Sequence, residues 1–575
     1  MTFVVAAASG GGAATALAAS LRGEAAANRV RVVQDGSSAV AWATNNLFVT
    51  THDDSTTLVV LDGRLHHPHA MAVDEAEAVA HRYRRLGKDF ASGLLGDYVI
   101  VLLDRARRRI LVARDPLGVR PWYQAGAGEQ WSGASDLATL VRLPWIHSEI
   151  DEATAIEYLA ARTESRGTTV YRDVGTLRPG TTVGFEPAGP FTVSHHRWEI
   201  TPDLGSRWAD AVERCRHLLS EAVRARLPQM TSATCELSGG IDSSAVTGTL
   251  ARLEVPDILA GRLVFDGPAD ERSYSDAVVD RWGISLVSSP PWIPPADEAA
   301  ELTRRLRRPL PDPNFTMFAT LHADFRSRGR LECLTGLGGD DAFVASRVAS
   351  RVTTAAKLRQ GGVVAGFVRS IVSRPRTGWT EIVRPTLHHL APGRGPRLPG
   401  WVSERAVLRA DLKGLLHRRS ERVTGLAAID DRIANLTSGY DAAILETRAV
   451  VTDLSGWRET HPFLDPHLIE AVYGFDPSWP VRGDDYRALE IAAYYDRLPP
   501  VVATRRTKAE FSEVFWPQFL APDTLASVRS GPLADLGWLD PTGFDVLVAN
   551  AKEGKANSAI PLSRCVGLDR WLRSL

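Results

Sequence analysis

One short segment of the chain carries residues whose types and spacing fit the binding of a phosphate group. It reads LSGGIDSS, lies where a strand-like stretch gives way to a helical pattern, and contains Leu237, Ser238, Gly239, Gly240, Asp242, Ser243 and Ser244. The free N–H groups of a helix's first turn and the positive end of its dipole form an anion site. Glycines let the backbone approach a ligand, and serine hydroxyls add donors. The segment therefore predicts a phosphate-binding turn.

The acid within this segment indicates a metal ion as well. A carboxylate beside phosphates makes sense only if a cation lies between them, and Mg²⁺ is the usual one. A second turn rich in glycine and acid, TGLGGDD at 335–341, also follows a strand-like stretch. Because ligands of a parallel sheet lie beyond the carboxyl ends of its strands, the two turns can face one crevice. We therefore predict that Asp242 and Asp340 share one Mg²⁺ ion.

The elements that must position these turns fall into two regions. Residues 1–200 hold short aliphatic runs bounded by Gly and Asp, such as GDYVIVLLD and RILVARD, which are typical of strands. The start of the chain predicts a strand followed by a helix, and a second helical stretch is predicted at 76–85. A polar segment with Pro and Gly, 198–206, predicts a linker. The predicted domains are therefore 1–200, an α+β domain dominated by sheet, and 206–575.

The second region changes its hydrophobic period. Apolar residues recur at helical spacing over 212–223. Strand-like segments follow at 262–265, 284–287 and 331–336, each separated from the next by a helical pattern. Alternating strands and helices predict an α/β, doubly wound parallel sheet. From Ala345 onward the pattern is mostly helical.

Composition excludes several classes of protein. Of the 575 residues, 44% are hydrophobic, which is enough for real cores. The 67 basic and 68 acidic residues give a net charge of −1, whereas a general nucleic-acid binder carries a basic surplus. Four scattered cysteines without a CxxC pair argue against a disulfide framework or a zinc site and indicate a reducing cytoplasm. No apolar run approaches the roughly 18 residues of a membrane span. An export signal would require basic residues near the start, whereas the first basic residue of this chain is Arg22.

The motifs together resemble a known family. SGGIDSS resembles the PP-loop of ATP pyrophosphatases, which split ATP between its α- and β-phosphates to adenylate a substrate. With TGLGGDD, then HPFLD at 461–465 and RRTKAEFS at 505–512, it is similar to asparagine synthetase-like enzymes. The stretches 96–123 and 131–137 look like their class II glutaminase domain. The resemblance covers nearly the whole chain and implies an α+β N-terminal-nucleophile-like sandwich domain followed by an α/β doubly wound PP-loop synthetase domain with a large helical portion.

The resemblance also implies cofactors and further site residues. ATP and Mg²⁺ are the expected cofactors, with Val264 and Gly336 as additional nucleotide contacts. Lys508 matches the family's lysine that contacts the phosphates and stabilises charge during adenylation and acyl transfer. A compact ammonium with a tunable pKa suits that role, and only six residues of this chain are lysines. Lys508 and Asp340 are therefore the predicted catalytic residues, whereas Asp465 in HPFLD is predicted to be buried and to cap a turn.

The first domain departs from the family's glutaminase. The family uses a cysteine at position 2, where this chain has Thr2. The family's Asn-Gly-Glu, which helps to hold glutamine and the oxyanion, is Asp62-Gly63-Arg64 here. An anionic Asp62 would oppose an oxyanion, and Arg64 reverses a charge. We therefore predict an inactive glutaminase domain that is kept as a scaffold.

Without ammonia from glutamine, another amine must attack the adenylate. Relatives that lost the same cysteine include β-lactam synthetases and the cyclases that close the isopeptide ring of lasso peptides. Leu337 replaces the tyrosine of β-lactam synthetases and the glutamate of asparagine synthetases, and it cannot take a proton. An α-amino group with a pKa of about 7.7–8 needs less help from a base. In addition, 121 residues separate Asp340 from Pro462, which suits a larger substrate such as a peptide.

These considerations predict an ATP-dependent lasso peptide cyclase, or macrolactam synthetase. It would adenylate an Asp or Glu side chain of a linear precursor peptide and join it to the peptide's N-terminal amine. The expected partners are that precursor, a leader peptidase and a leader-recognition protein, with no nucleic acid and no membrane, and the expected location is the cytoplasm. Two alternatives stay open. One is a β-lactam synthetase-like or asparagine synthetase-like ligase for small molecules, and the other is a catalytically silent binding subunit.

Overall fold

The structure is a computed structural model that describes most of the 575 residues. The described residues are 4–8, 13–22, 30–36, 38–43, 48–66, 74–126, 131–161, 167–203, 205–227, 230–310, 313–343, 348–360, 364, 399–412, 424–476, 479, 487–505, 512–555 and 558–575. Thr2 and Lys508, both singled out in the sequence, lie outside them. Both glycine-rich turns lie inside.

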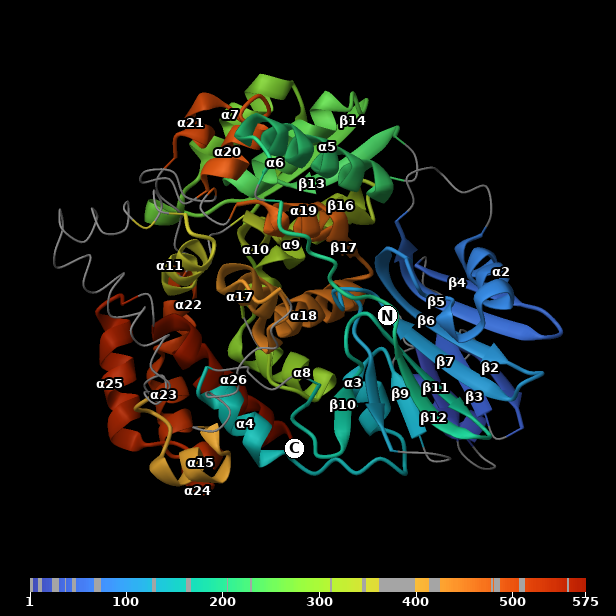
Figure 1. Cartoon of the computed structure of the whole chain (residues 1–575). Helices are drawn as coiled ribbons and strands as arrows, with labels where there is room; N and C mark the ends of the chain where they lie inside the picture. Colours follow the sequence, from blue (N-terminus) through green and yellow to red (C-terminus); the bar gives the residue numbers. More distant parts are fainter. Residues whose placement is uncertain are drawn as a thin grey trace.

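The first region forms two six-stranded sheets whose neighbouring strands are antiparallel. In spatial order, the first sheet contains β10 (Val174–Thr176), β8 (Tyr123–Ala125), β9 (Trp131–Ala134), β1 (Val4–Ala8), β3 (Ser38–Ala43) and β2 (Val30–Asp35). The second contains β12 (Gly189–Ser194), β11 (Thr181–Glu186), β7 (Arg109–Arg114), β6 (Gly96–Asp104), β5 (Thr57–Leu65) and β4 (Val49–Asp53). They are the blue and teal arrows in Figure 1.

Side-chain alternation explains why these strands are buried on both faces. In β5, Leu58 and Val60 enter the core between the two sheets, while Val59 and Leu61 pack under helix α2 (Glu75–Leu86). Helices α1 (Ala13–Arg22) and α3 (Leu137–Val141) lie against the first sheet. The result is the layered α+β sandwich that the sequence predicts, including the strand and helix at its start and the helix near 76–85.

The second region is built on a five-stranded parallel sheet. Its strands, in spatial order, are β15 (Ser285–Ser289), β14 (Asp257–Leu263), β13 (Ser232–Glu236), β16 (Glu332–Leu334) and β17 (Arg458–Thr460). The doubly wound sheet is therefore confirmed. The predicted strand at 262–265 is misplaced, because β14 begins at Asp257 and ends before Val264. Strand β17, next to the HPFLD segment, was not predicted.

Helices cover both faces of this sheet (Figure 1). On one face, α5 (Trp208–Arg226), α6 (Ile241–Arg252) and α7 (Arg272–Trp282) share a core with Cys235 and Leu237. On the other face, α9 (Ala319–Ser327) packs Leu321 and Phe325 against Cys333 and Trp457. The long helix α18 (Gly439–Ser455) lies on the same side and contacts α9 and β17.

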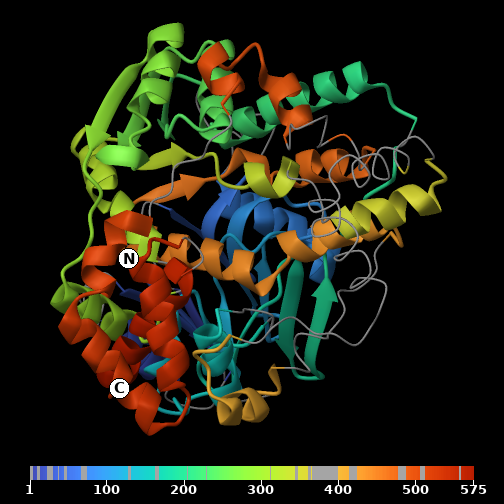
Figure 2. The same ribbon diagram turned by 90° about the vertical axis from the view of Figure 1, so that its left-hand side faces the viewer.

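The remaining helices of the second region are described by their bounds. They are α8 (Ala296–Leu306), α10 (Gly339–Phe343), α11 (Val348–Lys357), α15 (Glu404–Arg409), α17 (Ala427–Leu436), α19 (Pro466–Gly474), α20 (Ala488–Tyr494), α21 (Pro500–Ala503), α22 (Ser512–Phe519), α23 (Pro522–Arg529), α24 (Pro532–Asp535), α25 (Pro541–Lys552) and α26 (Ala559–Ser574). Figure 2 shows the last five gathered at one end of the molecule. In the described part of the chain, no helix has both the length and the apolar character that crossing a bilayer requires.

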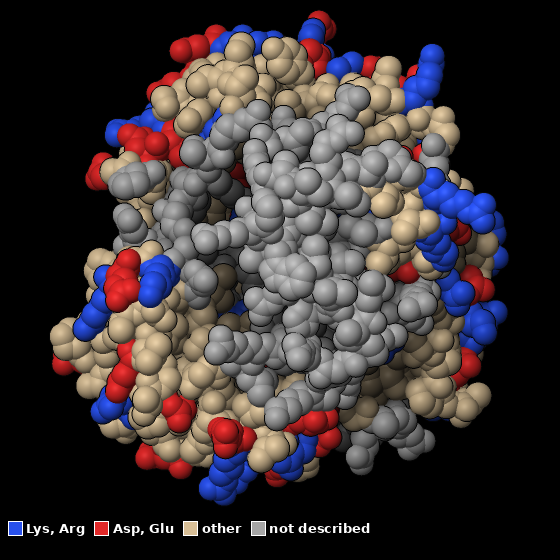
Figure 3. All heavy atoms as spheres, turned by 60° about the vertical axis from the view of Figure 1, so that its left-hand side comes forward, with Lys and Arg blue, Asp and Glu red and all other residues tan. Residues whose placement is uncertain are grey.

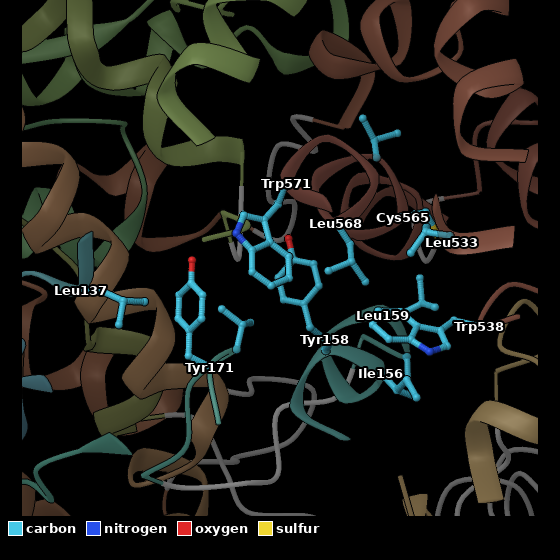
Figure 4. Close-up of a cluster of buried hydrophobic side chains, with 14 of the residues drawn as sticks. Leu137, Ile156, Tyr158, Leu159, Tyr171, Leu533, Trp538, Cys565, Leu568 and Trp571 are labelled. Carbon is cyan, nitrogen blue, oxygen red and sulfur yellow. The ribbon is translucent and has the colours of Figure 1, made fainter. Parts of the chain in front are cut away.

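A single apolar core joins the two regions. Tyr158 of α4 (Glu152–Leu159) and Tyr171 come from the first region and meet Trp571 and Leu568 of α26 (Figure 4). The rings of Tyr171 and Trp571 meet edge to face, with their centroids 5.9 Å apart. On the surface, acidic and basic side chains are interspersed around the face in Figure 3, in keeping with the net charge of −1.

Candidate active site

The first glycine-rich turn links β13 to α6, as the sequence predicts. Gly239 has a φ of +81°, which favours glycine, and a Cβ there would lie 2.7 Å from Tyr274 Cβ and 2.8 Å from the Ser275 nitrogen. Leu237 is buried, and its N–H donates to the Gly261 carbonyl of β14 at 2.7 Å. The backbone therefore turns sharply at the end of a central strand, close to α7.

Serine hydroxyls hold this turn in shape. Ser243 Oγ accepts the Ser238 N–H at 3.2 Å, lies 3.1 Å from Ser238 Oγ and can donate to the Gly240 carbonyl at 3.3 Å. The Gly240 N–H donates to Ser238 Oγ at 3.3 Å. Ser244 is fully buried, and its Oγ has no hydrogen-bond partner among the described residues. The serines thus brace the loop, and the backbone N–H groups at the start of α6 are left to bind an anion.

The second turn packs directly on the first. A Cβ on Gly336 would lie 2.6 Å from the Ser243 nitrogen, and a Cβ on Gly339 would overlap Asp242 Oδ1. Any larger side chain at these two positions would push the turns apart. The structure therefore brings TGLGGDD and SGGIDSS together at the carboxyl ends of the neighbouring strands β13 and β16.

One arginine bridges the two aspartates predicted to bind metal. Arg487 pairs with both carboxylate oxygens of Asp242, one of them at 3.0 Å, and its Nη1 lies 3.1 Å from Asp340 Oδ1. Arg487 Nη2 also pairs with the fully buried Glu490 at 2.6 Å. Burial opposes a charged Arg487, yet the neighbouring carboxylates raise its pKa. Burial raises the pKa of Glu490 far above its usual range.

This arrangement suits a divalent cation. Asp242 and Asp340 offer the hard oxygen ligands that Mg²⁺ prefers. The guanidinium between them shows that their carboxylates face a common point where positive charge is stabilised. The residues present therefore fit Mg²⁺. Arg487 and Glu490 were missed in the sequence, where they belong to no motif and stand 245 residues or more from Asp242.

Two other predicted nucleotide or phosphate contacts, Val264 and Lys508, are not tested by the structure. Val264 follows β14, and its N–H donates to the Ser289 carbonyl of β15 at 2.9 Å. Lys508 cannot be placed, because residues 506–511 are not among the described ones. Both assignments stay predictions.

Leu337 and the HPFLD segment complete the surroundings of the second turn. Leu337 packs in an apolar cluster with Leu117 and Ile469, so its side chain contributes packing and no proton acceptor. Asp465 is buried and caps α19 by accepting the His467 N–H at 3.1 Å, which confirms its predicted structural role. Thr335 Oγ1 lies 2.8 Å from His461 Nδ1, which ties the turn to this segment.

The residues that depart from a glutaminase make contacts between the two regions. Asp62 is fully buried and pairs with Arg120 at 2.9 Å, and Arg120 also pairs with Asp453 of α18 at 2.6 Å. Burial raises the pKa of Asp62, an effect that Arg120 and Arg458 oppose. Arg64 Nη1 lies 2.7 Å from Glu332 Oε2 of β16. Asp62 and Arg64 therefore serve as links to the synthetase-like region.

Comparison with known proteins agrees with this architecture. A family model described as "Asparagine synthase" matches residues 214–573, and one described as "Glutamine amidotransferase domain" matches residues 65–198. The glutamine-hydrolyzing asparagine synthetase 3 of Bacillus subtilis is 26% identical over 202 residues, which are 35% of this chain and 31% of that protein. The amidase chry2 of Gibberella zeae is 26% identical over 301 residues, which are 47% of this chain and 42% of that protein.

These similarities have clear limits. The chain spans less than half the length of either curated relative. The solved structure of glutamine phosphoribosylpyrophosphate amidotransferase from B. subtilis, complexed with ADP and GMP, covers 50% of this chain and 65% of its own. Its TM-score of 0.24 and sequence identity of 11% are too low to support a conclusion.

Proposed function

Because the chain belongs to the asparagine synthase family, we propose that it is an ATP-dependent, AMP-forming ligase that makes an amide bond. The observation that carries this proposal is the contact between the two glycine-rich turns, with Asp242 and Asp340 facing one cation position. A phosphate-binding turn beside two carboxylates is the arrangement that ATP and Mg²⁺ require. ATP and Mg²⁺ are also the cofactors of this family of ligases.

In the proposed first step, an oxygen of the substrate carboxylate attacks the α-phosphorus of ATP. The new O–P bond forms while the bond from the α-phosphorus to the bridging oxygen breaks, and pyrophosphate leaves with the electron pair. The N–H groups at the start of α6 hold the phosphates. Asp242 and Asp340 would hold Mg²⁺, which when bound neutralises charge on the phosphates. Lys508 is proposed to stabilise the charge of the transition state.

In the proposed second step, the N-terminal amine of the same peptide attacks the adenylate, so that the product is a macrolactam of the lasso peptide kind. Two features of the chain and one general argument support this choice. Asp62 and Arg64, which stand where a glutaminase needs other residues, are engaged in ion pairs. Leu337 offers no base in the second turn, where β-lactam synthetases carry a tyrosine and asparagine synthetases a glutamate. A ring closure within one molecule also avoids a bimolecular encounter, which can be worth about 7–11 kcal/mol.

The partners and the location follow from the same proposal. The substrate would be a linear precursor peptide, delivered by a leader peptidase and a leader-recognition protein, and neither nucleic acid nor a membrane would take part. All four cysteines are buried and free of disulfides, which is in keeping with a cytoplasmic location.

A second candidate is a ligase that makes amides from small molecules. The names of the curated relatives favour it, since they are an asparagine synthetase and an amidase. This candidate shares the adenylation step and differs in the amine and in the size of the substrate.

One experiment separates the two candidates. The purified chain is incubated with ATP, Mg²⁺ and a precursor peptide encoded beside its gene, and products are followed by mass spectrometry and by AMP and pyrophosphate release. The macrolactam proposal predicts a peptide that has lost one water, and no such product from a peptide whose α-amine is acetylated. If free amino acids outcompete the peptide, or if the acetylated peptide reacts normally, the result contradicts the macrolactam proposal and supports the small-molecule ligase.

A further inference from the structure

Four charged side chains meet inside the protein beside the phosphate-binding turn, on the sheet face covered by α9 and α18. They are Glu236 of β13, His322 of α9, Arg448 of α18 and Glu459 of β17, here called the Glu236 cluster. Arg448 Nη2 donates to Glu236 Oε1 at 3.1 Å, and Arg448 Nε donates to Glu459 Oε2. His322 Nε2 lies 3.3 Å from Glu459 Oε1 and 3.7 Å from Glu236 Oε1.

Glu236 is the most exposed member of the cluster and lies at the carboxyl end of its strand. It is the last residue of β13 and directly precedes Leu237 of the phosphate-binding turn. Its side chain is 13% exposed, against 3% for His322 and 4% for Glu459. Cys235 and Leu237 point into the core under α5 and α6, so Glu236 points to the opposite side. Because ligands lie beyond the carboxyl ends of parallel strands, Glu236 stands at the edge where substrate must bind.

The charges of the cluster balance when His322 carries a proton. Two carboxylates face the single guanidinium of Arg448, and an uncompensated charge in the interior is strongly destabilising. Burial opposes a charged His322, yet Glu236 and Glu459 raise its pKa. Among the described residues, His322 Nε2 has no hydrogen bond of ordinary geometry, so a small movement of Glu236 toward it would form one. The cluster can therefore adjust when the charge of Glu236 changes.

We propose that Glu236 accepts the proton of the attacking amine, and that His322, Arg448 and Glu459 position its carboxylate. The assignment deepens the proposed ligase function and depends on it. Leu337 cannot take this proton, and the Glu236 cluster offers a carboxylate one residue before the loop that binds the nucleotide.

The proposed step balances as follows. The amine nitrogen forms a bond to the carbonyl carbon of the acyl-adenylate, and the bond from that carbon to the phosphate oxygen of AMP breaks. AMP leaves with the electron pair of the broken bond. The proton that the nitrogen loses goes to an Oε atom of Glu236 and from there to solvent at the exposed edge.

The same side chains have a second possible use. One ligand atom each from Glu236, His322 and Glu459 lies within 4.8 Å of the others, which is the spacing of a metal site. Arg448 already supplies positive charge to both carboxylates, which keeps them ionised without a metal ion. A stoichiometric transition metal in the purified chain, lost in Glu459→Gln, would overturn the proposal in favour of a metal site.

Hydroxylamine provides the direct test, because it is largely neutral at pH 7 and attacks an adenylate without help from a base. Wild type and Glu236→Gln are compared for hydroxamate formation, which reports adenylation, and for amide formation with the natural amine. We expect Glu236→Gln to keep hydroxamate formation near the wild-type rate and to lose amide formation by about 10²–10⁴-fold, the usual contribution of a general base. Glu213→Gln, which removes an exposed carboxylate of α5, is the matched control and should change neither rate.

The outcomes are distinct. Equal amide formation in Glu236→Gln and wild type would overturn the proton-acceptor role, and so would loss of both products in a folded variant. If Glu236→Gln does not fold, Glu236→Asp keeps the charge and is expected to retain part of the amide-forming rate with normal hydroxamate formation. His322→Gln should lower amide formation and leave hydroxamate formation unchanged, as a positioning role requires. A wild-type chain that forms no hydroxamate from any carboxylate contradicts the ligase function itself.

Discussion

Arg487 places one guanidinium among the carboxylates of Asp242, Asp340 and Glu490. Without a cation, three acids at this distance would repel one another and resist ionisation. Arg487 lowers that repulsion in the absence of Mg²⁺. The Arg487 side chain therefore stabilises the site before the nucleotide arrives. Without Arg487, the stability of the folded site should depend on bound Mg²⁺.

We expect Arg487→Gln to lower the free energy of unfolding by about 3 kcal/mol in EDTA, because it leaves the largely buried carboxylate of Asp242 without a counter-charge. Added Mg²⁺ should restore a large part of this loss in the variant and change wild type less. Thermal unfolding with and without Mg²⁺ measures both effects. Equal responses to Mg²⁺ would show that Arg487 does not occupy the cation position.

Asp242→Asn and Asp340→Asn should each abolish adenylation, because each removes one of the two carboxylates assigned to Mg²⁺. Pyrophosphate release in the presence of the carboxylate substrate is the measurement. Asp341→Asn, in the same turn, is the matched control and should retain activity. Pyrophosphate release near the wild-type rate in either of the first two variants would contradict the metal assignment.

Lys508→Ala should slow product formation by about two to three orders of magnitude, since a preorganised charge of this kind is often worth about 3–4 kcal/mol. Lys508→Arg should restore little, because a planar guanidinium does not replace a compact ammonium. Steady-state rates of AMP release test both variants. Lys555→Ala, which removes an exposed lysine near the chain's end, should leave the rate unchanged.

At the scale of elements, the site depends on two turns that meet without side chains between them. The backbone of Gly336 and Gly339 lies against Asp242 and Ser243, at the junction of β16 with α10 and of β13 with α6. Sheet pairing brings the ends of these strands together, and the glycines allow the last few ångströms of approach.

Gly339→Ala is therefore expected to separate the turns and to reduce pyrophosphate release by at least about tenfold, because small misplacements of reacting groups are costly. Gly205→Ala is the matched control, since a Cβ at Gly205 meets nothing within 4 Å. Circular dichroism and pyrophosphate release are measured for both. A fully active Gly339→Ala would mean that the turns need not touch.

At the scale of the whole molecule, the first region is joined to the second by ion pairs and by a shared core. Arg120 connects Asp62 with Asp453 of α18, while Tyr158 and Tyr171 pack against the C-terminal helices. The region that resembles a glutaminase thus supports the helix that carries Arg448 of the Glu236 cluster. These contacts agree with the scaffold role that the sequence predicts for this region.

Asp62→Asn restores the residue type of a glutaminase, yet we expect no glutamine hydrolysis, because Thr2 and Arg64 remain. The variant should instead be less stable by about 3 kcal/mol, since Arg120 and Arg458 would share the charge of Asp453 alone. Glutamate release and thermal unfolding are the two measurements. Glutamate release from glutamine by wild type, lost in Thr2→Ala, would contradict the scaffold role.

Local chemistry allowed the turns to be found in the sequence. A strand, a glycine–serine turn and a helix start are encoded within about ten neighbouring residues, so SGGIDSS and the cap at Asp465 could be read directly. The alternation of strand and helix likewise indicated the doubly wound sheet. The exact limits of β14 were missed, because Asp257, Ala260 and Gly261 have weak strand propensity and are held there by pairing with the neighbouring strands.

Long-range packing decided the rest. Arg487 reaches Asp242 across 245 positions of the chain, and Arg448 reaches Glu236 across 212. No periodicity or motif encodes such pairs, since their energy arises only when separate elements exclude water around opposite charges. By itself the sequence determined the sandwich, the parallel sheet and the two turns. Only the tertiary structure decided that an arginine fills the cation position, that Asp62 and Arg64 join the two regions, and that Glu236 meets His322, Arg448 and Glu459.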